Sequence, residues 1–279
     1  MSSVNFKALH IACSEEFTEI LMAELSMLPF DTFEETSTGL SAFSDESLFD
    51  ETGVNQILER YKSSITNVRI EIIERENWNE EWEKNYDPVV VDDKIIVKAT
   101  FHQIERTYPF EITISPKMSF GTGHHATTHL MLKAQLDIDH QNKRVYDLGT
   151  GTGVLAIMAS KLGATDILAT DVDDWCIENS LENFALNGLK APVLKGPIKV
   201  LGIEQQADII LANINKNILL DEMVNYVRLL SDGGYLLLSG FYVEDVQDLT
   251  TVAEKMGLTS QGQSDRDNWA ILVFRKQSL

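Results

Sequence analysis

The stretch VYDLGTGTGVLAI, residues 145–157, decides the fold. It begins as an apolar strand, passes through Gly149, Gly151 and Gly153, and continues as an apolar helix. Glycines between a strand and a helix let a ligand approach the backbone closely, and the helix N-terminus presents free N–H groups to an anion. The stretch therefore predicts the binding site of a nucleotide-like cofactor in a doubly wound sheet.

The spacing of these glycines separates several classes of nucleotide site. The dinucleotide fingerprint is GxGxxG, and Val154 stands where its third glycine would be. This spacing disfavours an NAD-binding oxidoreductase without excluding it, and no evident hydride-transfer site supports one. A phosphate-binding P-loop is not predicted, because no GK[ST] follows the glycines.

Strands and helices alternate from about residue 126 to the end of the chain. Strands are predicted at residues 144–149, 166–172, 207–214, 233–241 and 268–276, and helices at residues 153–163, 174–188, 215–230 and 244–257. Alternation of this length predicts a mostly parallel, doubly wound α/β sheet.

Polar residues end the second and third of these strands. Asp171 lies 22 residues after Gly149, where a carboxylate can accept hydrogen bonds from ribose hydroxyls. The alternative is that Asp171 caps the next helix, but Asp173 and Asp174 are available for that role. Asn213 ends the third strand, at the edge of the sheet where ligands bind.

A second unusual stretch, SFGTGHHATTHL at residues 119–130, precedes the glycine turn. His125 and His129 have the i,i+4 spacing of a pair of metal ligands, but the stretch contains no cysteine and no HExxH. We therefore expect no metal here.

The motifs together resemble the ribosomal protein L11 methyltransferase family, within the class I methyltransferases that depend on S-adenosyl-L-methionine (AdoMet). The matching segments, which occur in the family's order, are NWNEEWEKNYDP, FGTGHHATT, DLGTGTGVLAI, ATDVD, LANI and GGYLLLSG. The resemblance implies a Rossmann-like class I fold with an antiparallel C-terminal strand. It also implies an enzyme that methylates lysine side chains of ribosomal protein L11, with N-terminal α-amines as a further candidate target.

The resemblance also implies which residues form the site. Thr128, Gly149, Asp171 and Asn213 would bind AdoMet, and Thr127 and Gly151 would assist them. The two threonines are expected just before the first core strand, near the amino-acid end of AdoMet. Asn213 would also be the catalytic residue, because its side-chain oxygen can accept hydrogen bonds from the substrate amine.

Three residues depart from the family's pattern. The family often has cysteine and serine where this chain has Thr150 and Thr152, and usually has leucine at the position of Asn215. If Asn215 faces the substrate amine, substrate handling would differ. No acidic residue is evident for the adenine amine, so adenine recognition is unassigned.

The N-terminal part reads as a separate domain. Residues 1–76 have the order βαββαβ of a small ferredoxin-like α+β domain, which we expect to recognise the substrate. Residues 77–90 read as a linker helix, in which Trp78, Trp82 and Tyr86 recur every four residues and form one face. Residues 91–279 form the predicted methyltransferase domain.

Composition narrows the possible partners and compartment. The net charge is −20, which disfavours direct nucleic-acid binding and would attract a cationic substrate. No apolar run reaches the ~18 residues of a membrane helix. The N-terminal residues do not read as a signal peptide, and the two cysteines fit a reduced cytoplasm. The alternatives are a class I methyltransferase with another amine, protein or RNA substrate, and a non-catalytic AdoMet-binding module.

Overall fold

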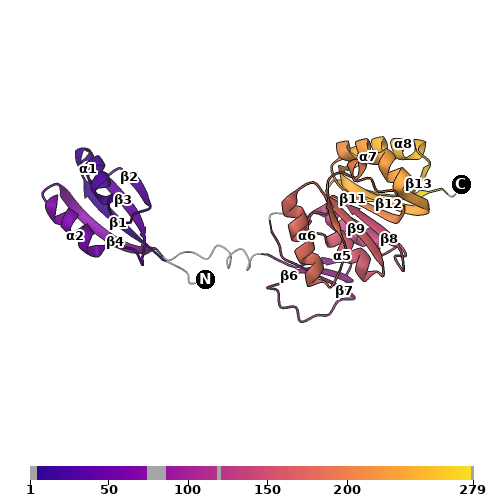
Figure 1. The fold of residues 1–279 in the computed structure, drawn as a ribbon, viewed down its shortest axis with the longest axis horizontal. Coiled ribbons are helices and arrows are strands. Elements are labelled where there is room, and N and C mark those ends of the chain that lie inside the picture. The colour runs from indigo at the N-terminus through magenta and orange to yellow at the C-terminus, as the bar shows by residue number, and fades with distance from the viewer. Residues whose placement is uncertain (1–4, 74–85, 118–120, 278–279) are drawn as a thin grey trace. The chain divides into compact units, whose positions relative to one another are not determined.

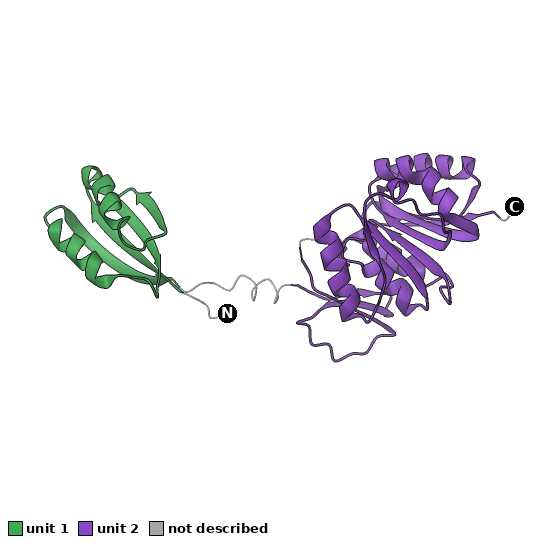
Figure 2. Ribbon diagram, in the orientation of Figure 1, with its two compact units in different colours: residues 1–85 green, residues 86–279 purple. Residues whose placement is uncertain are grey.

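The computed structural model describes residues 5–73, 86–117 and 121–277, which fall into two compact units, residues 1–85 and 86–279 (Figure 2). Each unit is described by itself. The boundary between Asn85 and Tyr86 falls within the predicted linker. Trp78 and Trp82 lie outside the described residues.

The first unit is a four-stranded antiparallel sheet with two helices (Figure 1). Its elements are β1 (Phe6–Cys13), α1 (Glu15–Leu25), β2 (Thr32–Thr36), β3 (Gly39–Asp45), α2 (Glu51–Arg60) and β4 (Ile65–Ile73). The strand order β2-β3-β1-β4 agrees with the predicted ferredoxin-like pattern. Buried aliphatic side chains of β1, β3 and both helices form its core, among them Leu9, Leu21, Leu40 and Ile57.

Helix α2 continues through Gly53, although glycine has a low helix propensity. Gly53 lies in the first turn, and its N–H donates to the Asp50 side chain at 2.9 Å. A Cβ atom on Gly53 would lie 2.5 Å from Asp50 Oδ2, so glycine permits this close cap.

The second unit is built on a seven-stranded sheet of order β10-β9-β8-β11-β12-β14-β13. Its strands are β8 (Arg144–Leu148), β9 (Asp166–Asp171), β10 (Val193–Lys195), β11 (Ala207–Asn213), β12 (Leu230–Tyr242), β13 (Leu258–Arg266) and β14 (Trp269–Lys276). The first five strands are parallel, and β14 is antiparallel to both its neighbours. This is the predicted class I arrangement, with an antiparallel strand at the C-terminus.

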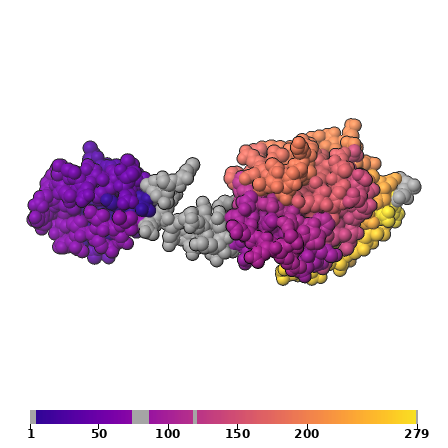
Figure 3. Space-filling model, turned by 90° about the horizontal axis from the view of Figure 1, so that it is seen from below, coloured from indigo at the N-terminus to yellow at the C-terminus, as the bar shows by residue number. Residues whose placement is uncertain are grey.

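Helices cover both faces of this sheet. They are α4 (Ala126–Gln135), α5 (Val154–Lys161), α6 (Asp174–Leu186), α7 (Lys216–Leu229) and α8 (Val246–Lys255), with short 3₁₀ turns η1 (Ile198–Val200) and η2 (Val243–Asp245). Alternate residues of β11 supply two separate cores. Ile209 and Leu211 pack with α4, α5 and α6, whereas Ile210 and Ala212 pack with α7 and α8. Figure 3 shows the resulting surface in the residue colours of Figure 1.

A small three-stranded sheet precedes the large one. It consists of β5 (Val89–Val91), β6 (Ile95–Ala99) and β7 (Phe110–Ile114). Tyr86 lies just before β5, and its ring contacts those of Phe101, His102 and His124. The described end of the predicted linker thus packs within the second unit.

Helix α4 and strand β13 of the second unit are among the elements that were not predicted. Helix α4 contains Thr127 and Thr128, and β13 forms the outer edge of the sheet. Among the residues described, no helix is both long enough and apolar enough to cross a membrane.

Candidate active site

A cavity of about 530 Å³ lies at the carboxyl ends of β8, β9 and β11. The six residues proposed from the sequence all line it: Thr127, Thr128, Gly149, Gly151, Asp171 and Asn213. Segments more than 80 residues apart in the sequence therefore meet at one site. Parallel strands bring this about because their carboxyl ends share one edge of the sheet.

The glycine turn requires a backbone that other residues rarely adopt. Gly149, Gly151 and Gly153 have φ values of +70°, +55° and +82°. A Cβ atom on Gly149 would lie 2.8 Å from Ile214, and one on Gly153 would lie 2.5 Å from Phe184. The Gly149 and Thr150 N–H groups both donate to the Thr170 carbonyl at 2.9 Å, which fixes the turn against β9.

The Asp171 carboxylate accepts hydrogen bonds from two turns, the glycine turn and the turn that follows β9. Its Oδ2 accepts from the Gly151 N–H at 2.9 Å, and its Oδ1 accepts from the Asp173 N–H at 3.1 Å. The cap of α6 is Asp173, whose side chain accepts from the Trp175 N–H. Asp171 therefore does not cap the helix, and its carboxylate lines the cavity.

Two cavity-lining residues carry buried polar atoms without a hydrogen-bond partner among the described residues. They are Thr128 Oγ1 and Asn213 Oδ1. An unpaired buried polar atom costs on the order of 1–3 kcal/mol. A bound ligand with complementary groups would remove that cost.

Asp147 is a buried acid that the sequence reasoning did not single out, although it precedes the first glycine by only two residues. Its Oδ2 accepts from the Thr150 hydroxyl at 2.6 Å and from the Ala156 N–H at 3.1 Å. Burial raises the pKa of Asp147 to about 6. Thr150, at the position where the family often has cysteine, thus supplies a hydroxyl donor to this carboxyl.

Three aromatic rings pack together, and two of them lie in the wall of the cavity. The Trp269 ring lies 4.6 Å from the His125 ring and 4.2 Å from the Tyr242 ring, measured between centroids. His125 and Trp269 both line the cavity. Trp269 was not predicted, because its place depends on the hairpin that β13 and β14 form.

His125 has a second role at the start of α4. It is the N-cap residue, and its Nδ1 accepts from the Thr127 N–H at 3.3 Å and lies 2.8 Å from Thr127 Oγ1. Burial lowers the pKa of His125. Within the described ranges, no three His, Cys, Asp or Glu side chains are grouped as metal ligands would be.

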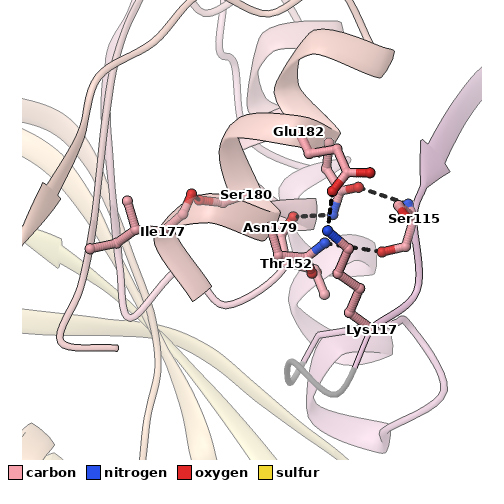
Figure 4. Close-up of polar contacts among 8 residues, drawn as sticks. Ser115, Lys117, Thr152, Ile177, Asn179, Ser180 and Glu182 are labelled. Carbon is pink, nitrogen blue, oxygen red and sulfur yellow. Dashed lines mark hydrogen bonds and ion pairs between the residues drawn. The ribbon is translucent and has the colours of Figure 1, made fainter. Parts of the chain in front are cut away.

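Asparagines of α6 tie the cavity loops together, and sequence reasoning missed them. The Asn183 amide accepts from the Ser115 N–H at 2.7 Å and donates to the Thr152 carbonyl at 2.8 Å. The Thr152 hydroxyl donates to the Gly121 carbonyl at 2.6 Å. One turn earlier, Asn179 donates to the Ser115 carbonyl (Figure 4). The four-residue spacing of Asn179, Asn183 and Asn187 was the available signal.

Helix α7 forms a further wall. Asn215, the departure from the family's leucine, is its N-cap and accepts from the Ile218 N–H at 3.2 Å. Ile218, Glu222 and Tyr226 line the cavity from the same helix. Val172, Pro197 and Ile198 add apolar surface, which suits a flat heterocycle better than a charged group.

The fold and this site define a class I AdoMet-dependent methyltransferase. The family model described as "Ribosomal protein L11 methyltransferase (PrmA)" matches residues 7–277. The chain belongs to the ribosomal protein L11 methyltransferase family.

Relatives and a solved structure agree with this assignment. The chain is 45% identical to "Ribosomal protein L11 methyltransferase" of Porphyromonas gingivalis over 93% of this chain and 91% of that one. It is 38% identical to the protein of the same name from Bacteroides fragilis, over 94% and 95% of the two chains. A crystal structure of ribosomal protein L11 methylase from Lactobacillus delbrueckii subsp. bulgaricus is similar with a TM-score of 0.64 and 26% identity, over 69% of this chain and all of that one.

Proposed function

We propose that this chain transfers methyl groups from AdoMet to lysine side-chain amines of ribosomal protein L11, with N-terminal α-amines as a second class of target. The observation that carries the proposal is the pair of unpartnered atoms, Thr128 Oγ1 and Asn213 Oδ1, in one cavity with the glycine turn. Family membership supplies the substrate.

The residues present fit AdoMet. Thr127 and Thr128 would hold its amino-acid end beside the glycine turn, and Asp171 would accept from its ribose hydroxyls. The lone pairs of the Asp171 carboxylate that are not used by Gly151 and Asp173 remain for that purpose. The apolar surface of Val172, Pro197 and Ile198 would take the adenine.

When bound, AdoMet supplies a methyl group on a positively charged sulfur, which is already activated for transfer to a nucleophile. The chain's own task is to align a neutral amine with it and to exclude water. A lysine in water has a pKa of about 10.4, so its amine must lose a proton before it can react.

Asn213 would aim that amine. Its Oδ1 can accept a hydrogen bond from the amine N–H group, and this bond would orient the nitrogen lone pair toward the methyl group. An amide is not a base at neutral pH, so the proton is not taken by Asn213. We infer that it leaves to water.

The first unit would bind L11 itself. Binding surface beyond the target amine raises the local concentration of the amine at the second unit. The two units are compact on their own, so recognition and transfer can be carried by separate parts of the chain. Both cysteines are free thiols, which supports a reaction in the reduced cytoplasm.

Transfer of tritiated methyl groups from AdoMet into purified L11, followed by mass spectrometry of the product, tests the proposal. We expect label in L11 and added masses of 14 Da per methyl group on its amines, and no label with Asn213→Leu. Label in RNA or in a small amine but not in L11 would redirect the proposal to another substrate.

A further inference from the structure

We propose that Trp269, backed by Tyr242 and His125, recognises the amine end of the substrate through its π face, and so determines that the cavity accepts alkylated ammonium groups. This rests on the proposed function, because it identifies the part of the cavity that takes the substrate amine.

The first observation is geometric. Trp269 and His125 line the cavity that also contains Asn213. The Tyr242 ring is tilted by only 33° against Trp269, so it backs the indole, whereas the His125 ring meets it at 69°. An aromatic surface and an amide oxygen thus belong to one cavity, as the binding of an alkylammonium end requires.

The second observation is that the indole is held by rigid backbone. Trp269 begins β14, directly after Asp267 and Asn268, whose φ values of +51° and +66° form the tight turn of the hairpin. Trp269 pairs with Tyr242 across β12 and β14, and the Val243 N–H donates to the Asn268 carbonyl at 3.1 Å. A ring held in this way is preorganised for a ligand.

The third observation is electrostatic. The described lining of the cavity contains no lysine or arginine, but it contains the carboxyl groups of Asp171, Asp173 and Glu222. Burial lowers the pKa of the His125 imidazole, so this ring is neutral near pH 7 and does not repel a cation. A cation near Trp269 would therefore meet no fixed positive charge of the cavity lining; Arg266, which pairs with Trp269 across the β13–β14 hairpin, lies outside that lining.

The chemistry of the substrate calls for such a surface. An amine arrives largely as an ammonium ion, and its methylated forms are also cations near pH 7. Each methyl group replaces an N–H group that could donate a hydrogen bond to Asn213 Oδ1. The amide therefore has fewer donors to bind as methylation proceeds. An aromatic face attracts the cation whether it carries hydrogens or methyl groups.

The test compares two ligands on the unaltered full chain, with S-adenosylhomocysteine present. The probes are Nα-acetyl-Nε-trimethyllysine amide and its neutral isostere, in which carbon replaces the charged nitrogen. We expect the charged probe to bind about 2- to 30-fold more tightly, as a single cation–π contact would give. Equal binding of the two probes would overturn the proposal.

Variants locate the effect. Trp269→Phe should keep the preference for the charged probe, and Trp269→Leu should abolish it while leaving the ratio of AdoMet to S-adenosylhomocysteine affinities unchanged. Trp175→Leu is the matched control, because Trp175 is 48% exposed and lies outside the cavity lining. A change in the cofactor ratio with Trp269→Leu would show that the ring serves the sulfonium of AdoMet and would overturn the assignment to substrate.

Failure of this inference is distinguishable from failure of the proposed function. The probe measurement needs no L11, so it stands even if L11 is not labelled. If L11 is labelled, Trp269→Leu should slow the second methyl transfer to one nitrogen more than the first, so singly methylated product accumulates. Equal slowing of both transfers would contradict the inference while leaving the L11 activity intact.

Discussion

The two units of the chain differ in whether all of their buried polar side chains have hydrogen-bond partners. In the first unit, the buried polar side chains find partners: Ser44 donates to the Pro29 carbonyl, Ser41 bonds to His10, and Thr18 bonds to Cys13. In the second unit, Thr128 and Asn213 carry buried oxygens without a partner among the described residues. Satisfied groups stabilise a fold, whereas unsatisfied groups that face a cavity are held in place for a ligand.

The difference supports a division of labour. The first unit has what a small recognition module needs: a closed core and a sheet whose outer strand β4 is almost wholly exposed. The second unit bears the cost of the unpaired atoms, and two extensive cores support it. Four predictions address this contrast, beginning with the largest expected effect.

Removal of the first unit should separate binding from transfer. A chain that begins at Asn77 should lose methyl transfer to L11 on the order of 1000-fold, since it no longer holds the protein substrate near the site. Its affinity for AdoMet, measured by calorimetry, should stay within about twofold, because the cavity belongs to the second unit. Circular dichroism must first show that the shortened chain is folded. Rapid L11 methylation by the folded shortened chain would refute the recognition role.

Two glycines of the second unit differ in what surrounds them. Gly153→Ala should lower the free energy of unfolding by about 2–4 kcal/mol, because the left-handed backbone is strained and the new Cβ overlaps Phe184. Gly188→Ala, with φ +71° and no atom within 4 Å, should cost only about 1–2 kcal/mol. Urea unfolding measures both. Equal losses would mean that the overlap with Phe184 is relieved by repacking.

Asp147 should make the stability of the second unit depend on pH. Its folded pKa of about 6 lies above the ordinary value of 3.8, so the folded chain binds more protons than the unfolded chain between these values. The free energy of unfolding therefore falls as pH rises from about 4 to 6, by on the order of 3 kcal/mol. Asp147→Asn should remove this part of the slope. An unchanged slope in urea unfolding between pH 4 and 6 would contradict the raised pKa.

The smallest expected effects come from substituting one aspartate in each unit. Asp171 and Asp50 each accept a glycine N–H at 2.9 Å, the first at the cavity and the second as the cap of α2 in the first unit. Asp171→Ala should weaken AdoMet binding by about 1–3 kcal/mol through loss of the acceptor for the ribose. Asp50→Ala should cost about 1 kcal/mol of stability and leave AdoMet affinity unchanged. Unaltered affinity in folded Asp171→Ala would remove the ribose assignment.

The features that sequence predicted are those with a local signal. The glycine turn, Asp171 and Asn213 each follow a strand whose apolar pattern is continuous, so their common edge could be inferred from alternation alone. Strand β13 gave no such signal, because eight of its nine residues are exposed and its sequence, LTSQGQSDR, is polar. Without β13 the hairpin was missed, and with it the position of Trp269.

Contacts between distant segments explain the other omissions. Asn183 acts through Ser115 and Thr152, which lie 68 and 31 residues away, so the four-residue spacing of the asparagines could indicate a shared helix face but not these partners. Helix α4 was missed because its first turn contains Thr127 and Thr128, and threonine has a lower helix propensity than alanine or leucine. Residues at the site that have a local sequence pattern could therefore be predicted. The hydrogen bonds between distant segments that support them could be identified only from the structure.

Hydrogen–deuterium exchange of the full chain, with and without saturating AdoMet, tests whether the second unit alone holds the cofactor. We expect AdoMet to slow exchange in peptides covering residues 145–157, 166–173 and 207–216 and to leave residues 5–73 unchanged, because the cavity and its unpaired polar atoms lie in the second unit. Slowed exchange within residues 5–73, or none across residues 145–157, would contradict it.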